Sequence, residues 1–89
     1  MKAIVTVIGR DGTGIIAGVS ALLAAEKINI LNVSQTILDG NFTMMMTVDL
    51  VEADNTLETV KAKASVLAET LKVHIVIQNQ AIFDRMHQI

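Results

Sequence analysis

The sequence predicts an α+β fold in which two helices cover one face of a four-stranded antiparallel sheet. Four short segments show the apolar or alternating patterns of β-strands, and two longer segments repeat apolar residues at helical spacing. Their order is strand, helix, strand, strand, helix, strand, which makes two strand–helix–strand units within 89 residues. We therefore expect a ferredoxin-like βαββαβ sandwich over residues 1–79, followed by a short C-terminal helical extension over residues 80–89.

The first strand and the first helix are predicted within residues 2–27. Lys2–Ile8 is rich in β-branched residues and contains no breaker, which is typical of a buried strand. Ile15–Lys27 is long and apolar enough to form a helix. The residues of this helix that can face a sheet are Ile16, Val19, Leu22 and Leu23. Because the remaining side is also mostly apolar, we expect a second subunit to bury it.

A glycine-rich turn, GRDGTG (residues 9–14), joins this strand to this helix. Glycine allows a positive φ and lets another backbone or a ligand approach closely. Asp11 or Thr13 can cap the helix, whose first backbone N–H groups, at Gly14–Ile16, lack intrahelical partners. These donors and the positive end of the helix dipole favour a carboxylate or a phosphate. The turn is thus the predicted small-molecule site, and a purely structural turn is the alternative.

The middle of the chain predicts a β-hairpin. Ile30–Leu38 alternates as a half-buried strand, Asp39–Asn41 is a turn signal, and Phe42–Leu50 is the next strand. In the first strand Leu31, Val33 and Ile37 share one face, opposite Asn32, Ser34 and Thr36. In the second strand Phe42, Met44, Met46, Val48 and Leu50 share one face. The strand period therefore divides the three consecutive methionines between two faces, as core filler rather than a metal site.

The last third of the chain predicts the second helix, the fourth strand and a short terminal helix. Asn55 and Glu58 have capping-box spacing ahead of an apolar stripe. That stripe comprises Leu57, Val60, Ala64, Leu67, Ala68 and Leu71. The strand Lys72–Gln78 turns Val73, Ile75 and Ile77 inward and His74 to the opposite face. In the tail Ala81–Ile89, we expect Ile82, Phe83 and Met86 to dock on the sheet or on a partner, because so short a helix is unstable alone.

The face of the sheet away from the helices is predicted to be mixed in polarity. Its expected members are Thr6, Ser34, Thr36, Thr43, Met45, Thr47 and Val76. Because this face is partly apolar, we expect it to contact a partner.

Composition excludes several classes of function. The net charge of −2, without a basic block, argues against nucleic acid and anionic membranes as partners. The absence of cysteine excludes disulfides and thiolate zinc sites, and His74 has no second ligand at metal-binding spacing. We expect no metal and no cofactor. Since no apolar run could span a bilayer and no signal peptide is evident, we expect a cytoplasmic protein.

Two enzymatic interpretations of the sequence are possible. GTGIIA (residues 12–17) matches a weak dinucleotide fingerprint, but the chain has no room for a second mononucleotide-binding half. Acylphosphatases share the predicted topology, and Arg10 and Asn32 could hold a phosphate and a water. That family's motif around its arginine is absent, and no nucleophile–base pair stands out. We therefore expect no catalytic residues.

The segment TVIGRDGTGIIAGVSALLAAEKINI (residues 6–30) resembles the opening of an ACT domain. The resemblance lies in the strand, Gly9 and Asp11, Gly14–Ile15, Ala17, Val19–Ser20 and Asn29–Ile30. The later elements follow in ACT order, so the resemblance covers roughly residues 1–79. The NFTMMM strand and the short terminal helix are similar to those of small free-standing ACT proteins of bacteria and archaea.

This resemblance implies a regulatory domain without catalysis that binds an amino acid between the subunits of a homodimer. The contacts that it implies come from the first loop and, opposite it, from the start of the second strand. The corresponding residues are Asp11, Gly12, Thr13, Gly14 and Ile15, with Asn29, Ile30 and Leu31 opposite. Thr13 stands where many ACT domains have proline. A regulated enzyme or transcription factor is an implied partner. The alternatives are an interaction or dimerisation module without a ligand and, third, an acylphosphatase-like enzyme.

Overall fold

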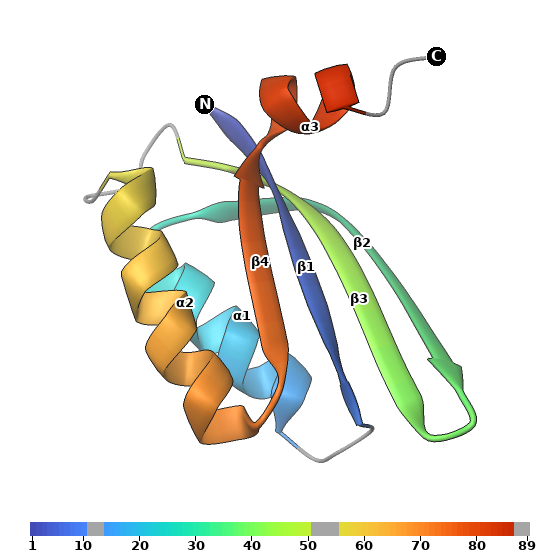
Figure 1. Ribbon diagram of the computed structural model, residues 1–89. Helices are drawn as coiled ribbons and strands as arrows, with labels where there is room; N and C mark the ends of the chain where they lie inside the picture. The colour runs from blue at the N-terminus through green and yellow to red at the C-terminus, as the bar shows by residue number, and fades with distance from the viewer. Residues whose placement is uncertain (11–13, 51–55, 87–89) are drawn as a thin grey trace.

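The computed structural model describes residues 1–10, 14–50 and 56–86, and their elements follow the predicted order (Figure 1). The elements are β1 (Lys2–Arg10), α1 (Ile15–Ala25), β2 (Asn29–Leu38), β3 (Asn41–Asp49), α2 (Leu57–Leu71), β4 (His74–Asn79) and α3 (Gln80–Met86). The strands form one four-stranded sheet in the order β2-β3-β1-β4, with every pair antiparallel. The predicted ferredoxin-like α+β sandwich is confirmed.

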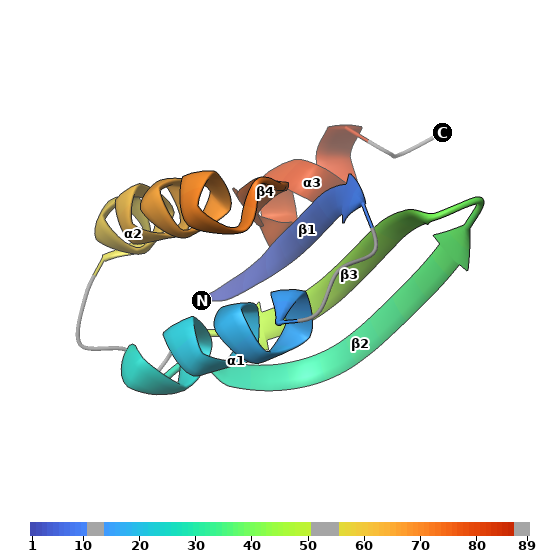
Figure 2. The ribbon, with the colours of Figure 1, turned by 90° about the horizontal axis from the view of Figure 1, so that it is seen from below.

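The hydrophobic core lies between one face of the sheet and helices α1 and α2, which Figure 2 shows on the same side of the strands. In β1 and β3, alternate residues point into this layer, and the buried pairs are Ala3 with Val48, Val5 with Met46, and Val7 with Met44. The predicted inward residues Phe42, Met44, Met46 and Val48 of β3 are buried, and so is Leu50, which follows the strand. The aliphatic and methionine core therefore follows the strand period.

Helix α1 buries only one side within the chain. Its buried residues are Ile15, Val19 and Leu23, whereas Ile16 is 45% exposed, so the expectation that Ile16 faces the sheet is wrong. The exposed side carries Ala17, Ala21, Ala24 and Ala25. Gly18 allows α1 to approach α2, since an added Cβ would lie 3.1 Å from Leu71 Cδ1. The second side of α1 thus remains an exposed, mostly apolar surface.

Strand β2 differs most from its prediction. All ten of its residues are exposed, so the expected half-buried strand is wrong. Val33 and Ile37 pair with the buried Met46 and Phe42, which puts them on the predicted face, but β2 is an edge strand that the helices leave uncovered. A register shift between Ile30 and Asn32 makes Leu31 an extra residue, and it is Ile30 that pairs with the buried Val48.

The turn between β2 and β3 is the predicted hairpin. Asp39 and Gly40 both have positive φ, 52° and 77° respectively. Two consecutive left-handed residues form the type of two-residue turn that matches the twist of the flanking strands. This conformation accounts for the Asp-Gly sequence at this position.

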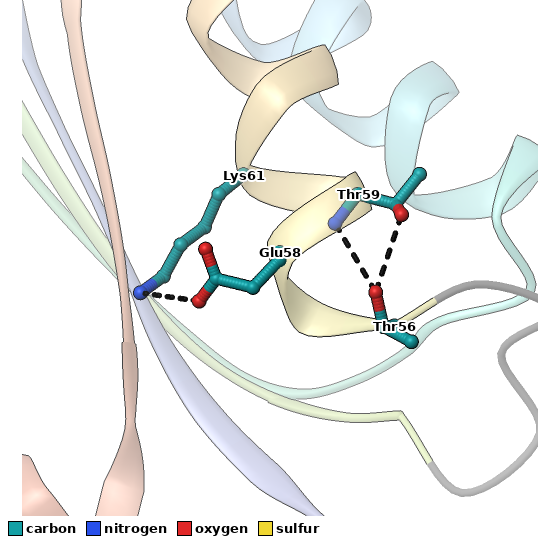
Figure 3. Close-up of polar contacts among 4 residues, drawn as sticks. All are labelled: Thr56, Glu58, Thr59 and Lys61. Carbon is teal, nitrogen blue, oxygen red and sulfur yellow. Dashed lines mark hydrogen bonds and ion pairs between the residues drawn. The ribbon is translucent and has the colours of Figure 1, made fainter.

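Helix α2 begins at a different cap from the predicted one. Asn55 lies outside the described residues, and the N-cap is Thr56, whose Oγ1 accepts a hydrogen bond from the backbone N–H of Thr59 at 3.3 Å (Figure 3). Glu58 lies near Lys61 instead, with 3.7 Å between Oε1 and Nζ. The predicted apolar stripe of α2 does face the core, where Val60 and Ala64 are buried.

The terminal helix α3 packs on the sheet. It contacts β1 and β4 and, among the described residues, neither α1 nor α2. Of the residues expected to dock, Phe83 is half-buried, whereas Ile82 and Met86 are exposed within the chain. Ile4 points away from α1 and α2 and is still only 8% exposed, while Ile8 on the same face is 48% exposed. Helix α3 therefore covers the Ile4 end of that face.

No helix in the described ranges is long and apolar enough to cross a membrane.

Candidate functional site

The first part of the predicted site is the connection from β1 to α1. Asp11, Gly12 and Thr13 lie outside the described residues. Gly14 is the N-cap of α1, with φ 93° and ψ −6°, and its carbonyl accepts the N–H of Gly18 at 2.8 Å. A left-handed N-cap is readily adopted only by a residue without a Cβ, so glycine is required for its backbone rather than for space. An added Cβ at Gly14 would meet no atom within 4 Å.

The start of α1 offers backbone donors. Among the described residues no side chain caps it, and its first turn contains no acidic residue. The N–H groups of the first turn have no intrahelical acceptor, and the helix dipole adds partial positive charge at this end. The side chain of Ile15 is buried, so Ile15 can contribute only its backbone to a site. The chemistry available here is the binding of an anionic group.

The second part of the predicted site, Asn29–Leu31, is positioned by the end of α1. Lys27 is left-handed with φ 58°, its N–H donates to the Ala24 carbonyl, and the N–H of Ile28 donates to the Leu23 carbonyl. This pair of hydrogen bonds is a Schellman motif, in which the residue after the left-handed one packs back on the helix. Ile28 is buried accordingly. The chain then enters β2 with Asn29, Ile30 and Leu31 exposed.

Within one chain, the two parts of the predicted site are far apart. Gly14 and Ile15 follow the end of β1, whereas Asn29 pairs with Asp49, which pairs with Lys2 at the start of β1. Figure 1 shows the α1 start and the β2 start at opposite ends of the sheet. Helix α1 lies on the β2 side of the sheet, and α2 lies on the β4 side (Figure 2). A single chain therefore does not assemble the predicted site.

Glu26 is a charged residue that sequence reasoning missed. Its side chain is buried at the end of α1, where Oε1 forms an ion pair with Nζ of Lys63 on α2. Lys63 itself is half exposed. The signal was present in the sequence, because Glu26 follows Val19 and Leu23 at helical spacing and thus lies on the buried stripe. This pair links the two helices and lies at the end of α1 away from Gly14.

The residues of the acylphosphatase interpretation do not converge. Arg10 pairs with Asn41, whereas Asn32 pairs with Thr47, which also pairs with Ile4. Because Ile4 and Arg10 lie six residues apart on the same strand, Arg10 and Asn32 are separated by roughly 20 Å along the strands. Within the described ranges, no three His, Asp or Glu side chains are close enough to hold a metal. His74 lies exposed on the face away from α1 and α2, as predicted.

Comparison with known proteins identifies relatives over the whole length of the chain. The sequence profile of the ACT domain matches residues 2–78. A UPF0237 protein of Listeria monocytogenes is 49% identical over 89 residues, which are all of both chains. A solved ACT domain protein from Streptococcus pneumoniae is 43% identical and superposes with a TM-score of 0.82, covering 94% of each chain. The regulatory subunit of aspartate kinase from Thermus thermophilus, in a ligand-free form, is 27% identical, with a TM-score of 0.61, over 86% of this chain and 50% of the subunit.

Proposed function

Because this protein belongs to the ACT domain family, we propose that it is a regulatory module that binds an amino acid and catalyses no reaction. We further propose that two copies form a homodimer and that the amino acid lies between them. A regulated enzyme or transcription factor would then respond to the ligand. The name of one relative, the regulatory subunit of aspartate kinase, supports a regulatory role in this family.

The start of α1 supports an amino acid as the ligand. Its N–H groups at residues 15–17, which no side chain of the described residues caps, and its dipole favour a carboxylate. A simple anion would meet repulsion from Asp11, three residues before Gly14 in the sequence. An amino acid satisfies both groups, because its carboxylate binds the N–H groups while its ammonium is drawn to Asp11. Such a charge-assisted contact contributes about 1.5–3 kcal/mol.

The separation of the two parts of the site supports a dimeric site. Strand β2 is an edge strand without a single charged residue, and all of it is exposed. If a two-fold axis perpendicular to the sheet paired β2 with its copy, the pairing would be antiparallel. The partner's Asn29 would then approach the Leu38 end of β2, which is the end where α1 begins. This arrangement would bring Asn29, Ile30 and Leu31 of one copy toward Gly14 and Ile15 of the other.

The exposed side of α1 supports the same interface. Helix α1, whose exposed side carries Ile16 and the alanines, contacts β2, the strand that carries the uncovered Val33 and Ile37. Small residues permit close helix approach, and pairing of the β2 edges would bury this surface as well. The same surface favours the second candidate function, an interaction module that pairs in this way without binding a ligand.

A thermal-shift and calorimetry screen against the proteinogenic amino acids, with acetate and phosphate as simple anions, tests the proposal. A ligand present at a hundred times its dissociation constant adds about 2.7 kcal/mol of stability. For such a ligand, Asp11→Ala should weaken binding about tenfold or more while the affinity for acetate stays equal or rises. If no amino acid stabilises the protein, the interaction module is the better proposal.

Gly14→Ala and Gly40→Ala form a matched pair for locating the site. Both glycines have positive φ, and an added Cβ would meet no atom within 4 Å at either position. Each alanine should cost about 1–2 kcal/mol of stability through backbone strain. Only Gly14→Ala should also weaken amino-acid binding, because it distorts the donors at the start of α1. Equal affinities in the two variants would contradict a site at Gly14.

A further inference from the structure

We propose that the amino acid bound by this protein has an apolar side chain, which lies against Ile16 of α1 and Ile37 of β2. This inference rests on the proposed function and deepens it, because it names the class of amino acid and the residues that select it. Its basis is the set of exposed side chains at the end of the molecule where α1 begins.

Ile16 lies on the side of α1 opposite α2. An added Cβ at Gly18 would lie 3.1 Å from Cδ1 of Leu71, so the Gly18 side of α1 faces α2. Ile16 precedes Gly18 by two residues, which is about 200° around a helix of 3.6 residues per turn. Of the two helices, α1 contacts β2, whereas α2 contacts β4 (Figure 2). Ile16 is therefore on the flank of α1 that is directed away from α2 and toward the β2 side of the sheet.

Ile37 is the last residue of β2 on the face that carries the helices. It pairs with the buried Phe42, and Phe42 pairs with Gly9 near the end of β1. Paired residues of neighbouring strands have their side chains on the same face, so Ile37 faces the same side as Phe42. The start of α1 and the end of β2 lie at the same end of the sheet (Figure 1). Both isoleucines thus lie at the end where the carboxylate is proposed to bind.

The side chain of the ligand would meet no opposite charge from α1 or β2, since neither element contains a charged residue. Arg10 also ends its strand here, but it lies three residues after the buried Val7, so strand alternation puts it on the face away from the helices. Asp11 is already assigned to the ammonium of the ligand. In the proposed dimer, Ile30 of the other copy adds a further apolar side chain to this end.

These surroundings favour an apolar over a charged or polar ligand. A charged side chain placed between the two copies would lose its hydration without gaining an ionic partner. An apolar side chain would instead remove from water two isoleucines that are 45% and 55% exposed within the chain, Ile16 and Ile37 respectively. The gain grows with the apolar area that the ligand covers.

Isothermal titration calorimetry with two pairs of amino acids of similar shape tests the inference. Leucine and asparagine differ in polarity rather than in size, and so do valine and threonine. We expect leucine to bind at least about tenfold more tightly than asparagine, and valine about tenfold more tightly than threonine. Glutamate and lysine should bind more weakly than leucine.

Three matched isoleucine-to-glutamine variants locate the selecting residues. Ile16→Gln and Ile37→Gln should each lower the ratio of the leucine affinity to the asparagine affinity by about tenfold. The control is Ile82→Gln, because Ile82 is 50% exposed on α3 at the opposite end of the sheet (Figure 1), and it should leave this ratio unchanged. A variant that only weakened the dimer would weaken both ligands equally and would not move the ratio. Circular dichroism and the melting curve check that each variant is folded.

The outcomes separate this inference from the proposed function. If asparagine, glutamate or lysine binds more tightly than leucine, the protein still binds an amino acid but the apolar class is wrong. Tighter binding of asparagine would favour contact with Gln35, which pairs with the buried Met44 and so shares the face of Ile37. A leucine preference that survives in folded Ile16→Gln and Ile37→Gln proteins would overturn the role of these residues. If no amino acid binds, the proposed function and this inference both fail.

Discussion

Replacement of Gly9 by alanine should destabilise the protein through one steric contact. Gly9 lies in β1, and a Cβ built on it would lie 2.5 Å from Cγ1 of Val73 and 3.0 Å from its Cβ. Neither atom can move away easily, because Val73 is β-branched and its N–H donates to the Ala68 carbonyl at 3.0 Å in the turn after α2. Either β1 or that turn must therefore shift.

The expected cost of Gly9→Ala is about 1–3 kcal/mol, the range for overpacking a well-packed interior. In a domain of this size, each kcal/mol lowers the melting temperature by about 4–8 °C. Gly18→Ala is the control, because its Cβ would meet only the tip of a flexible leucine at 3.1 Å and alanine is the better helix former. We expect Gly18→Ala to stay within about 1 kcal/mol of the wild type.

A double-mutant cycle measured by urea denaturation identifies the cause. Val73→Ala removes Cγ1, so Gly9→Ala should cost at least about 1 kcal/mol less in that background. Two results would refute the reasoning. One is a Gly9→Ala protein as stable as the wild type, and the other is an equal cost in both backgrounds.

Three further predictions concern the helices and are checked by melting temperature or urea denaturation. Lys63→Met should lower the free energy of unfolding by about 1–3 kcal/mol, because it removes the cation paired with the buried Glu26. Lys61→Met loses only an exposed ion pair and should stay within about 0.5 kcal/mol of the wild type. Equal costs for the two variants would contradict the importance of burial. Thr56→Ala should cost about 1 kcal/mol by removing the cap of α2, and an unchanged stability would mean that water replaces it. Deletion of residues 81–89 should lower the melting temperature because α3 covers one end of the sheet face opposite α1 and α2, and no change would mean that the packing of α3 contributes nothing to stability.

The sequence alone is sufficient for the order of the elements and for the core of β3. Four apolar residues at alternate positions of β3 leave one choice of buried face, and the Asp-Gly turn fixes the hairpin. The second helix was predictable for the same reason, since its apolar stripe repeats at helical spacing. Local patterns of this kind depend on neighbours within the same element.

Structural features that depend on neighbouring elements could not be predicted from such local patterns. The alternation of β2 correctly predicts which face Val33 and Ile37 share, but it cannot tell that no helix of the same chain covers them. Lys27 and Lys72 adopt left-handed conformations at the ends of their helices, where glycine would be expected. The residue type therefore does not predict these helix ends. For the predicted site, the sequence identifies the backbone of Gly14, whereas its distance from Asn29 within one chain follows from the topology of the sheet.

The proposed pairing of the β2 edges gives a closed dimer, because a two-fold axis uses the same edge of both copies. Pairing of edge strands can lead to aggregation when further copies add to the other edge of the sheet. In this protein the other edge is β4, which has six residues, whereas β1 and β3 have nine. Short edge strands resist further pairing. A chain that leaves the uncharged β2 exposed can therefore associate through it without forming an open-ended sheet.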